Sequence, residues 1–437
     1  RYIFDIETRG FLDGLETPDD LFIITAINID TGERLAAKLD ECEELARKLY
    51  VADVLVGHNI FGFDLPALQK TLGWWDRLED PRDFDTMIAG RLIWSNLFDQ
   101  DVVRGKAGHP LPKNLYGSHS LKAYGLRLGV MKDDYSGGFD SFNEEMFEYA
   151  KQDVEVTLAL WDRIQQEQYS TRALDLEMAV ARLMARQERT GFPFDRDAAQ
   201  VLLRDLMAEQ ADIQARLQAA FGSWEVPGDL FVPKANNSKL GYVRGVETRK
   251  TGRTVVFNPT SRDHIANRLT TLYGWEPKAF TDGGKPKVDE TILTQLYKEK
   301  GWEVCKDLAD HFTITKRLGQ LSDGNQAWLK KEKDGRIHGR VITNGAVSGR
   351  ATHSNPNIAQ VPGIRAPFGD RCRRLFMAPH GRVLVGADAS GLELRCLAHY
   401  LNMLGDTEYA EEVVHGDIHT RNQQAAGLPT RDQAKTF

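Results

Sequence analysis

The first 165 residues alternate apolar segments with helical stretches, and this alternation constrains the fold more than any other feature of the sequence. Tyr2–Ile6 and Leu21–Ile29 are apolar runs typical of strands. Cys42–Tyr50 and Glu144–Gln166 carry the apolar periodicity of helices. Strands that alternate with helices indicate sheet and helices packed in layers. The sequence therefore predicts an α/β domain over residues 1 to about 165.

Two further blocks follow. Leu174–Phe221 runs almost without helix breakers except at Thr190–Pro193, which predicts two long amphipathic helices. The segment Ser223–Asn258 is rich in Gly, Pro, Asn and Lys and is longer than an ordinary loop, which predicts a functional insertion. From about residue 337 short strands mix with arginine-rich loops. There we expect an apolar strand at Val383–Asp388 and a helix at Gly391–Leu404.

Composition excludes several classes of protein. The 437 residues are 27% charged and 41% hydrophobic, which is typical of a globular chain with two or three cores. No apolar run approaches the roughly 18 residues of a membrane-spanning helix, and no signal peptide pattern begins the chain. The four cysteines are far apart, which argues against a disulfide scaffold or a zinc site and fits a reducing cytosol: Cys42, Cys305, Cys372 and Cys396.

The net charge of -7 argues mildly against a polyanionic partner, but the charge is unevenly distributed. Lys234–Arg253 holds six basic residues against one acidic residue. Gly363–Arg382 holds five arginines against one aspartate. Either run alone is typical of a solvated face.

Five side chains of the first block suggest a metal site. Asp5 and Glu7 are two apart on a strand, so both project from one face. Asp64 follows an apolar strand at the start of a helix, where sites in α/β sheets form. Tyr149 and Asp153 are four apart and share a helical face. Each of these features alone is typical of a solvated surface or of a helix N-terminal charge.

Together, the order and spacing of these five residues resemble the DEDD exonuclease family in its tyrosine variant. Asp85–Thr86, Ser118–Leu121 and Arg127–Gly129 are similar to that family's linking segments. The resemblance implies a ribonuclease H-like 3'-5' exonuclease domain over residues 1–165. It implies two Mg²⁺ ions, or Mn²⁺, held by the four acids, and a Tyr149 that positions the attacking water.

The last block resembles the polymerase domain of family A DNA polymerases. D-A-S-G-L-E-L-R, beginning at Asp388, is similar to motif A. The resemblance implies that Asp388 and the Ala389 carbonyl bind both metal ions and that Glu393 excludes a ribose 2'-hydroxyl. Ser348–Pro362 is similar to the motif that grips the primer and template, which implies sequence-independent DNA contacts by Arg350, Thr352, Asn355, Asn357 and Gln360.

Two segments near the end of the chain are similar to the fingers of the same family. Gly416–Thr420 resembles the segment that leads to the fingers, and Arg431–Lys435 resembles the opening of motif B. The resemblance implies that His419, Arg431 and Lys435 contact the phosphates of the incoming nucleotide. A solvated helix face is the alternative interpretation of Arg431 and Lys435.

Gln187–Asp195 and Phe257–His264 resemble the thumb of the replicative polymerases of short-tailed lytic phages. In family members that recruit host thioredoxin as a clamp, the insertion between thumb helices is long. Here Ser223–Asn258 is short, which argues against thioredoxin as a partner. Its basic residues could instead contact the duplex directly.

These resemblances predict a proofreading DNA polymerase that replicates phage DNA in the cytosol of the infected bacterium. The expected fold is α/β: an exonuclease domain over 1–165, a mostly helical thumb over 166–336 with the insertion at about 223–258, and a partial α+β palm with the start of the fingers over 337–437. Primer–template DNA and dNTPs are the expected partners, with a replisome helicase–primase as a further candidate and no membrane.

The family's second palm carboxylate, in motif C, would lie beyond Phe437. We therefore expect this chain to need a C-terminal polymerase half for primer extension. A split gene, an intein-interrupted product and a truncated fragment all fit this expectation. Two other functions stay open: a stand-alone 3'-5' exonuclease, and a catalytically inactive DNA-binding remnant.

Overall fold

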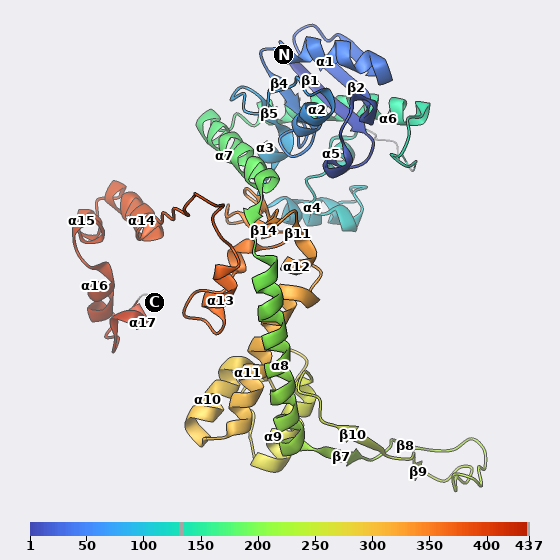
Figure 1. The fold of residues 1–437 in the computed structure, drawn as a ribbon, viewed down its shortest axis with the longest axis vertical. Coiled ribbons are helices and arrows are strands. Elements are labelled where there is room, and N and C mark those ends of the chain that lie inside the picture. The colour runs from blue at the N-terminus through green and yellow to red at the C-terminus, as the bar shows by residue number, and fades with distance from the viewer. Residues whose placement is uncertain (131–134, 136, 435–437) are drawn as a thin grey trace. The chain divides into compact units, whose positions relative to one another are not determined.

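The computed structural model describes residues 1–130, 135 and 137–434. The chain divides into two compact units, Arg1–Met377 and Ala378–Phe437. The fold is mixed α/β (Figure 1). The domain boundaries expected at residues 165 and 336 remain predictions. None of the helices in the described residues is long and apolar enough to cross a membrane.

A five-stranded sheet forms the core of the amino-terminal part, in the order β3-β2-β1-β4-β5. The strands are β1 Tyr2–Thr8, β2 Leu21–Asn28, β3 Arg34–Lys38, β4 Leu55–Gly57 and β5 Phe84–Asp85. Strands β1, β2 and β3 pair antiparallel, whereas β4 and β5 run parallel to β1. The strands predicted at the start of the chain and from Leu21 are confirmed.

Helices cover both faces of this sheet. Phe4 and Ile6 belong to the apolar cluster that includes residues of α1 (Cys42–Tyr50) and α2 (Asp64–Leu72). Ile3, on the opposite face of β1, packs in a cluster with Val154 of α6 (Glu144–Gln166). Because side chains alternate along a strand, Asp5 and Glu7 share the face of Ile3 and are directed to the side of α6.

Three smaller helices follow β5 in the chain: α3 Thr86–Ile93, α4 Leu97–Lys106 and α5 Leu121–Leu128. Short helical turns complete the connections. One of them, η5 (Gly319–Asp323), is a π-helical turn. The others are 3-10 turns: η1 Leu12–Gly14, η2 Pro18–Asp20, η3 Leu39–Glu41, η4 Lys113–Leu115 and η6 Ile358–Gln360.

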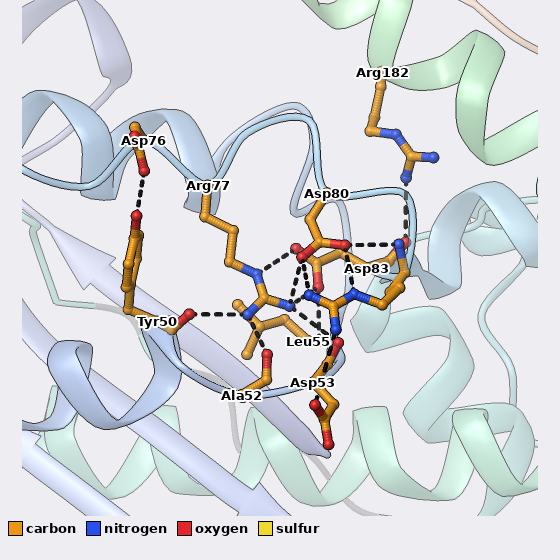
Figure 2. Close-up of polar contacts among 10 residues, drawn as sticks. Tyr50, Ala52, Asp53, Leu55, Asp76, Arg77, Asp80, Asp83 and Arg182 are labelled. Atoms are coloured by element: carbon orange, nitrogen blue, oxygen red, sulfur yellow. Dashed lines mark hydrogen bonds and ion pairs between the residues drawn. The ribbon is translucent and has the colours of Figure 1, made fainter.

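A buried ion-pair network fixes the loop that leads into β5 (Figure 2). Arg77 Nε donates to Asp83 Oδ2 at 2.9 Å, and its Nη1 donates to the carbonyls of Tyr50 and Ala52. Asp83 Oδ1 also accepts the Leu55 N–H at 2.9 Å. Arg182, from α7 (Thr171–Thr190), donates to the Asp83 carbonyl at 3.3 Å. The network therefore links β4, β5 and α7.

Long helices dominate the middle of the chain. The two predicted between Leu174 and Phe221 are confirmed as α7 and α8 (Arg196–Phe221). Helix α11 (Glu303–Leu318) packs against α8 and α10 (Glu290–Lys300), and α9 (Arg262–Tyr273) contributes Ile265 and Leu269 to their shared core.

The predicted insertion is a β-ribbon between α8 and α9 (Figure 1). Strand β7 (Ser223–Val226) pairs with β10 (Arg253–Val256). Beyond them β8 (Leu230–Phe231) pairs with β9 (Thr248–Arg249).

Short strands tie the next block to the long helices. Strand β12 (Arg336–Ile337) pairs with β11 (Glu332–Lys333) and with β6 (Phe192–Pro193). Strands β13 (Arg340–Ile342) and β14 (Thr352–Ser354) form a hairpin. Helices α12 (Trp328–Lys331) and α13 (Gly369–Arg374) flank this region.

The regular structure of the described part of the unit that begins at Ala378 consists of helices: α14 Leu392–Met403, α15 Thr407–His415, α16 Ile418–Ala425 and α17 Arg431–Ala434. The predicted helix near Gly391–Leu404 is confirmed, but the predicted strand at Val383–Asp388 is wrong. The side chains of Val383 and Val385 are 82% and 88% exposed. The physical reason is that a strand needs a neighbour to pair its backbone groups, and the described residues provide none here.

Candidate metal centre and nucleotide-binding residues

Three of the acids predicted as metal ligands lie close together in the structure. One carboxylate oxygen each of Asp5, Glu7 and Asp153 lies within 4.8 Å of the others. Three negative charges at this spacing repel one another unless a proton or a cation neutralises them. Carboxylate oxygens are also the ligands that hard divalent cations prefer. The arrangement therefore fits a site for Mg²⁺ or Mn²⁺.

The position of Asp153 depends on how α6 is held against the sheet. Thr25 lies opposite Asp5 in the β1–β2 pairing. Its buried hydroxyl donates to the carbonyl of Ala150 at 3.1 Å. Because Asp153 is one helical turn farther along α6, this bond sets its height above β1. The sequence carried no signal for this contact.

The fourth acid, Asp64, lies beside the group but is not part of it. It is the first residue of α2, and its side chain is buried. Strand β1 pairs with β4 only at Tyr2 and Ile3, and farther along β1 the Ile6 N–H donates to the Asp64 carboxyl. Burial, with smaller contributions from the charges of Asp85 and Asp153, raises the pKa of Asp64 to about 7. A cation nearby would favour the ionised form.

Tyr149 lies one turn before Asp153 on α6 and is half-buried. Its ring is 5.6 Å from that of Tyr135, measured between centroids. The Tyr135 hydroxyl donates to the Gly138 carbonyl and accepts from the Asn143 amide. Asn143 also caps α6. The segment before α6 therefore packs against Tyr149.

Asp85 holds the turn that leads to Asp64 through hydrogen bonds to the backbone. The sequence placed this residue only in a linking segment. Its buried carboxylate accepts N–H bonds from Met87 and Ile88 at the start of α3. It also accepts from Asn59 and Phe61, in the turn that leads to Asp64. An acid at a strand end before a helix is the signal that could have identified this role.

The predicted primer–template residues are gathered on one hairpin and the turn after it. Thr352 begins β14, and Arg350 is exposed just before it. The Asn355 N–H donates to Gln326 Oε1 at 3.0 Å. Gln320 Nε2 donates to the Gln360 carbonyl at 3.1 Å. Asn357, between them, precedes η6. The side chains of Arg350, Asn355 and Gln360 remain accessible to a ligand.

The motif A residues lie in an open environment. Asp388 and Ala389 are exposed in a segment without regular structure, and Glu393 is exposed in the first turn of α14. Within the described residues Asp388 joins no group of acids that could hold a metal. In the part of the chain that the structure describes, no second carboxylate therefore pairs with Asp388.

The predicted phosphate-binding residues of the fingers lie around Asp417. Arg431 donates to both carboxylate oxygens of Asp417, at 2.8 and 2.9 Å. Asp417 also accepts the N–H groups of His419 and Thr420 at the start of α16. The Arg431 guanidinium holds the pKa of Asp417 well below its usual range. Lys435, the third predicted phosphate ligand, lies outside the described residues.

Comparison with known proteins decides the family. The family model for DNA polymerase family A matches residues 243–436. The DNA-directed DNA polymerase of Enterobacteria phage T3 is 38% identical over 88% of this chain and 67% of that protein. The chain belongs to DNA polymerase family A. The DNA-directed DNA polymerase of Escherichia phage T7 is also 38% identical to this family A chain, over 92% of it and 69% of the phage T7 protein.

A solved structure supports the fold of this family A polymerase chain. The POL domain of Pol1 from M. smegmatis, in complex with DNA primer–template and dNTP, superimposes with a TM-score of 0.66 at 18% sequence identity. The match covers 99% of this chain and 66% of that one. This family A chain thus spans about two thirds of the length of each relative. The residues that the family model matches include Asp388 and Arg431 but not the acids of β1.

Proposed function

We propose that the protein is a DNA-directed DNA polymerase with a 3'-5' proofreading exonuclease, acting in the replication of phage DNA. The observation that carries the polymerase activity is 38% identity with two phage DNA-directed DNA polymerases over 88% and 92% of the chain. The observation that carries the exonuclease is the convergence of Asp5, Glu7 and Asp153. Residues 1–165 would form the exonuclease, 166–336 the thumb and 337–437 the palm and the start of the fingers.

In the exonuclease, Asp5, Glu7 and Asp153 would hold Mg²⁺, with Asp64 as a further ligand. Bound divalent ions supply an activated water and stabilise the leaving 3' oxygen of a phosphodiester. The protein's part is to hold its carboxylates in place before the DNA arrives. Asp64 must lose its proton to become a ligand, and the buried surroundings oppose this until the cation is present. Tyr149, packed against Tyr135, would position the water.

In the polymerase, Asp388 and the Ala389 carbonyl would bind metal. Glu393 would exclude an incoming nucleotide that carries a ribose 2'-hydroxyl. His419, Arg431 and Lys435 would contact its triphosphate. Arg431 holds a carboxylate with two parallel bonds, which is the geometry it would use for a phosphate. The triphosphate would therefore have to replace Asp417 on Arg431. This exchange is feasible because both side chains are about half exposed.

Primer–template DNA would be held by the β13–β14 hairpin and by the β-ribbon of the thumb. The neighbour from M. smegmatis was solved with primer–template and dNTP, which supports both as ligands of this fold. In the connection between β8 and β9, Lys234, Lys239 and Arg244 are exposed, and they form no ion pair within the described residues. Such cations would contact DNA phosphates directly, without thioredoxin, and the affinity would fall with salt.

Digestion of 3'-labelled single-stranded DNA in Mg²⁺ tests the exonuclease. We expect Asp5→Ala/Glu7→Ala to lower the rate about 1,000-fold or more, because metal chemistry supplies several kcal/mol of transition-state stabilisation. Asp40→Ala/Glu43→Ala is the matched control, since it removes two exposed acids of the same types elsewhere on the surface. Equal digestion by the native protein and the Asp5/Glu7 variant would refute the metal site.

Primer extension by this chain supplied with a C-terminal polymerase half tests the polymerase separately, because we expect the chain by itself not to extend a primer. Asp388→Ala should abolish extension and leave digestion of single strands unchanged. Asp5→Ala/Glu7→Ala should abolish digestion of single strands and leave primer extension unchanged. Asp282→Ala, an exposed acid of the thumb, is the control for both assays. A loss of both activities in either variant would contradict two independent sites.

A further inference from the structure

A cavity of about 480 Å³ lies where the exonuclease segment meets the β13–β14 hairpin. One wall comes from Arg91 of α3, Phe98 of α4 and the Ser118–Ser120 loop. The other comes from Asn344–Val347 and Thr352 of the hairpin. The cavity contains none of the acids assigned to the metal centre. Its volume is within the range of small-ligand pockets and far too small for a duplex.

Arg91 is the distinctive group of this cavity. It is part-buried, and no carboxylate lies within ion-pair distance of it among the residues that the structure describes. Asp85, the acid that influences it most, is already bonded to four backbone N–H groups. Burial lowers the pKa of Arg91, and the charge of Arg340 nearby lowers it further. A part-buried guanidinium with no ion-pair partner among the described residues is less well hydrated than an exposed one, and an anion in the cavity would pair with it.

The remaining lining is neutral and suited to a nucleotide. Among the described residues no acidic side chain lines the cavity, so none of them would repel a phosphate. Burial lowers the pKa of His119 to about 4, which leaves it uncharged at neutral pH. The hydroxyls of Ser118 and Thr352 can donate to phosphate oxygens. The Phe98 side chain is 55% exposed and offers a surface on which a base can stack.

The elements that form the two walls indicate which molecule would bring a phosphate into the cavity. Thr352 belongs to the hairpin that we propose to hold the primer and template. The opposite wall is fixed to the exonuclease sheet, because His58, which follows β4, donates from Nε2 to the His119 carbonyl at 2.9 Å. A single strand bound in the cavity would contact both walls. A basic group beside an exposed aromatic ring is the usual arrangement for binding single strands.

We propose that this cavity binds one phosphodiester and the adjacent base of single-stranded DNA, with Arg91 on the phosphate and Phe98 against the base. The cavity is then a subsite for the primer strand between the DNA-holding hairpin and the exonuclease. This assignment rests on the proposed function, since it requires that one chain both holds primer–template and degrades the 3' end.

Binding of a fluorescein-labelled dT oligonucleotide tests the subsite without catalysis. Anisotropy is measured in EDTA on the Asp5→Ala/Glu7→Ala background over a range of salt. Arg91→Met should weaken binding several-fold and lower the slope of log affinity against log salt by about 0.7, the value for one phosphate contact on a single strand. Phe98→Ala should weaken binding about 5-fold or more without changing the slope.

Two control variants accompany these measurements. Arg82→Met removes an exposed arginine that is paired with Asp80, and Tyr169→Ala removes an exposed aromatic residue outside the cavity. Both should bind like the parent. Circular dichroism and the unfolding midpoint verify that Arg91→Met and Phe98→Ala remain folded. Unchanged affinity and salt slope in both folded cavity variants would overturn the proposal.

Digestion on the active background separates this proposal from the exonuclease itself. Arg91→Met should slow the degradation of long single strands and spare a dinucleotide that is too short to reach the cavity. Equal slowing of both substrates would place Arg91 in the metal centre and overturn the subsite. If native protein degrades neither substrate, the proposed exonuclease fails, but the binding measurement in EDTA still decides the subsite.

Discussion

The acids of the amino-terminal sheet and the acid of motif A have opposite environments. Asp5, Glu7 and Asp153 are gathered by a strand and a helix whose other residues form a buried core. Asp388 is exposed on a segment without regular structure, between two valines that are themselves largely exposed and the helix α14. A folded core can hold like charges together because packing elsewhere offsets their repulsion. Asp388 experiences no such constraint, so its geometry depends on what it binds.

The arginines of the two regions differ in the same way. Arg77 is buried in a network with Asp83 and the carbonyl groups of Tyr50, Ala52 and Asp53 (Figure 2). Arg431 forms an equally regular pair with Asp417, but both side chains are about half exposed. Burial therefore decides the energetic weight of an ion pair more than its geometry does.

The largest expected effect on stability comes from Arg77. Arg77→Met leaves the buried Asp83 without its cation and should lower the free energy of unfolding by about 3–5 kcal/mol. Arg431→Met, the matched change in an exposed pair, should leave the unfolding midpoint unchanged. Chemical denaturation followed by circular dichroism measures both. A similar loss in the two variants would mean that the Arg431–Asp417 pair is buried in solution.

A matched pair of leucines tests the same contrast in apolar packing. Leu55 is fully buried in β4, whereas the Leu384 side chain is 59% exposed. Leu55→Ala should lower the free energy of unfolding by about 2–5 kcal/mol, because it removes buried surface and leaves a cavity. Leu384→Ala should change it by less than about 0.5 kcal/mol. A large loss for Leu384→Ala would show that this segment packs against something in solution.

A third effect is the pH dependence of the metal-free sheet. The pKa of Asp64 is about 7 in the folded state, above the value of about 4 in an unfolded chain. The folded state therefore holds this proton more tightly, and the stability it contributes is complete below pH 4 and is lost as the pH rises to 7. The slope cannot exceed that of one proton, about 1.4 kcal/mol per pH unit.

Thermal unfolding in EDTA from pH 4 to 8 measures this slope, and Asp64→Asn is the control, since it cannot titrate and should flatten the curve. Mg²⁺ should restore stability at pH 8 in the native protein more than in Asp64→Asn. Identical curves for the native protein and Asp64→Asn would mean that Asp64 is ionised throughout, and the buried environment described for it would be wrong.

Much of the local structure could be predicted from the sequence. The ranges predicted for α1 and α6 match the observed bounds, because each presents an apolar face at helical spacing. Asp64 was correctly placed at the start of a helix. The pattern failed at Val383–Asp388, where an apolar run has no neighbouring strand among the described residues. Apolar character reports a tendency to be buried, but a strand also needs a hydrogen-bonding partner.

The sequence by itself determined which residue types are available and which share a strand or helix face: Asp5 with Glu7, and Tyr149 with Asp153. Only the tertiary structure decided which of these faces meet. The hydrogen bond between Thr25 and the Ala150 carbonyl holds α6 against the sheet. Strand β1 pairs with β4 only at Tyr2 and Ile3, so the Ile6 N–H is available to the Asp64 carboxyl. The cavity around Arg91 likewise joins segments more than 200 residues apart. The physical reason is that periodicity is a local property of the chain, whereas burial and hydrogen bonding depend on which distant segments pack together.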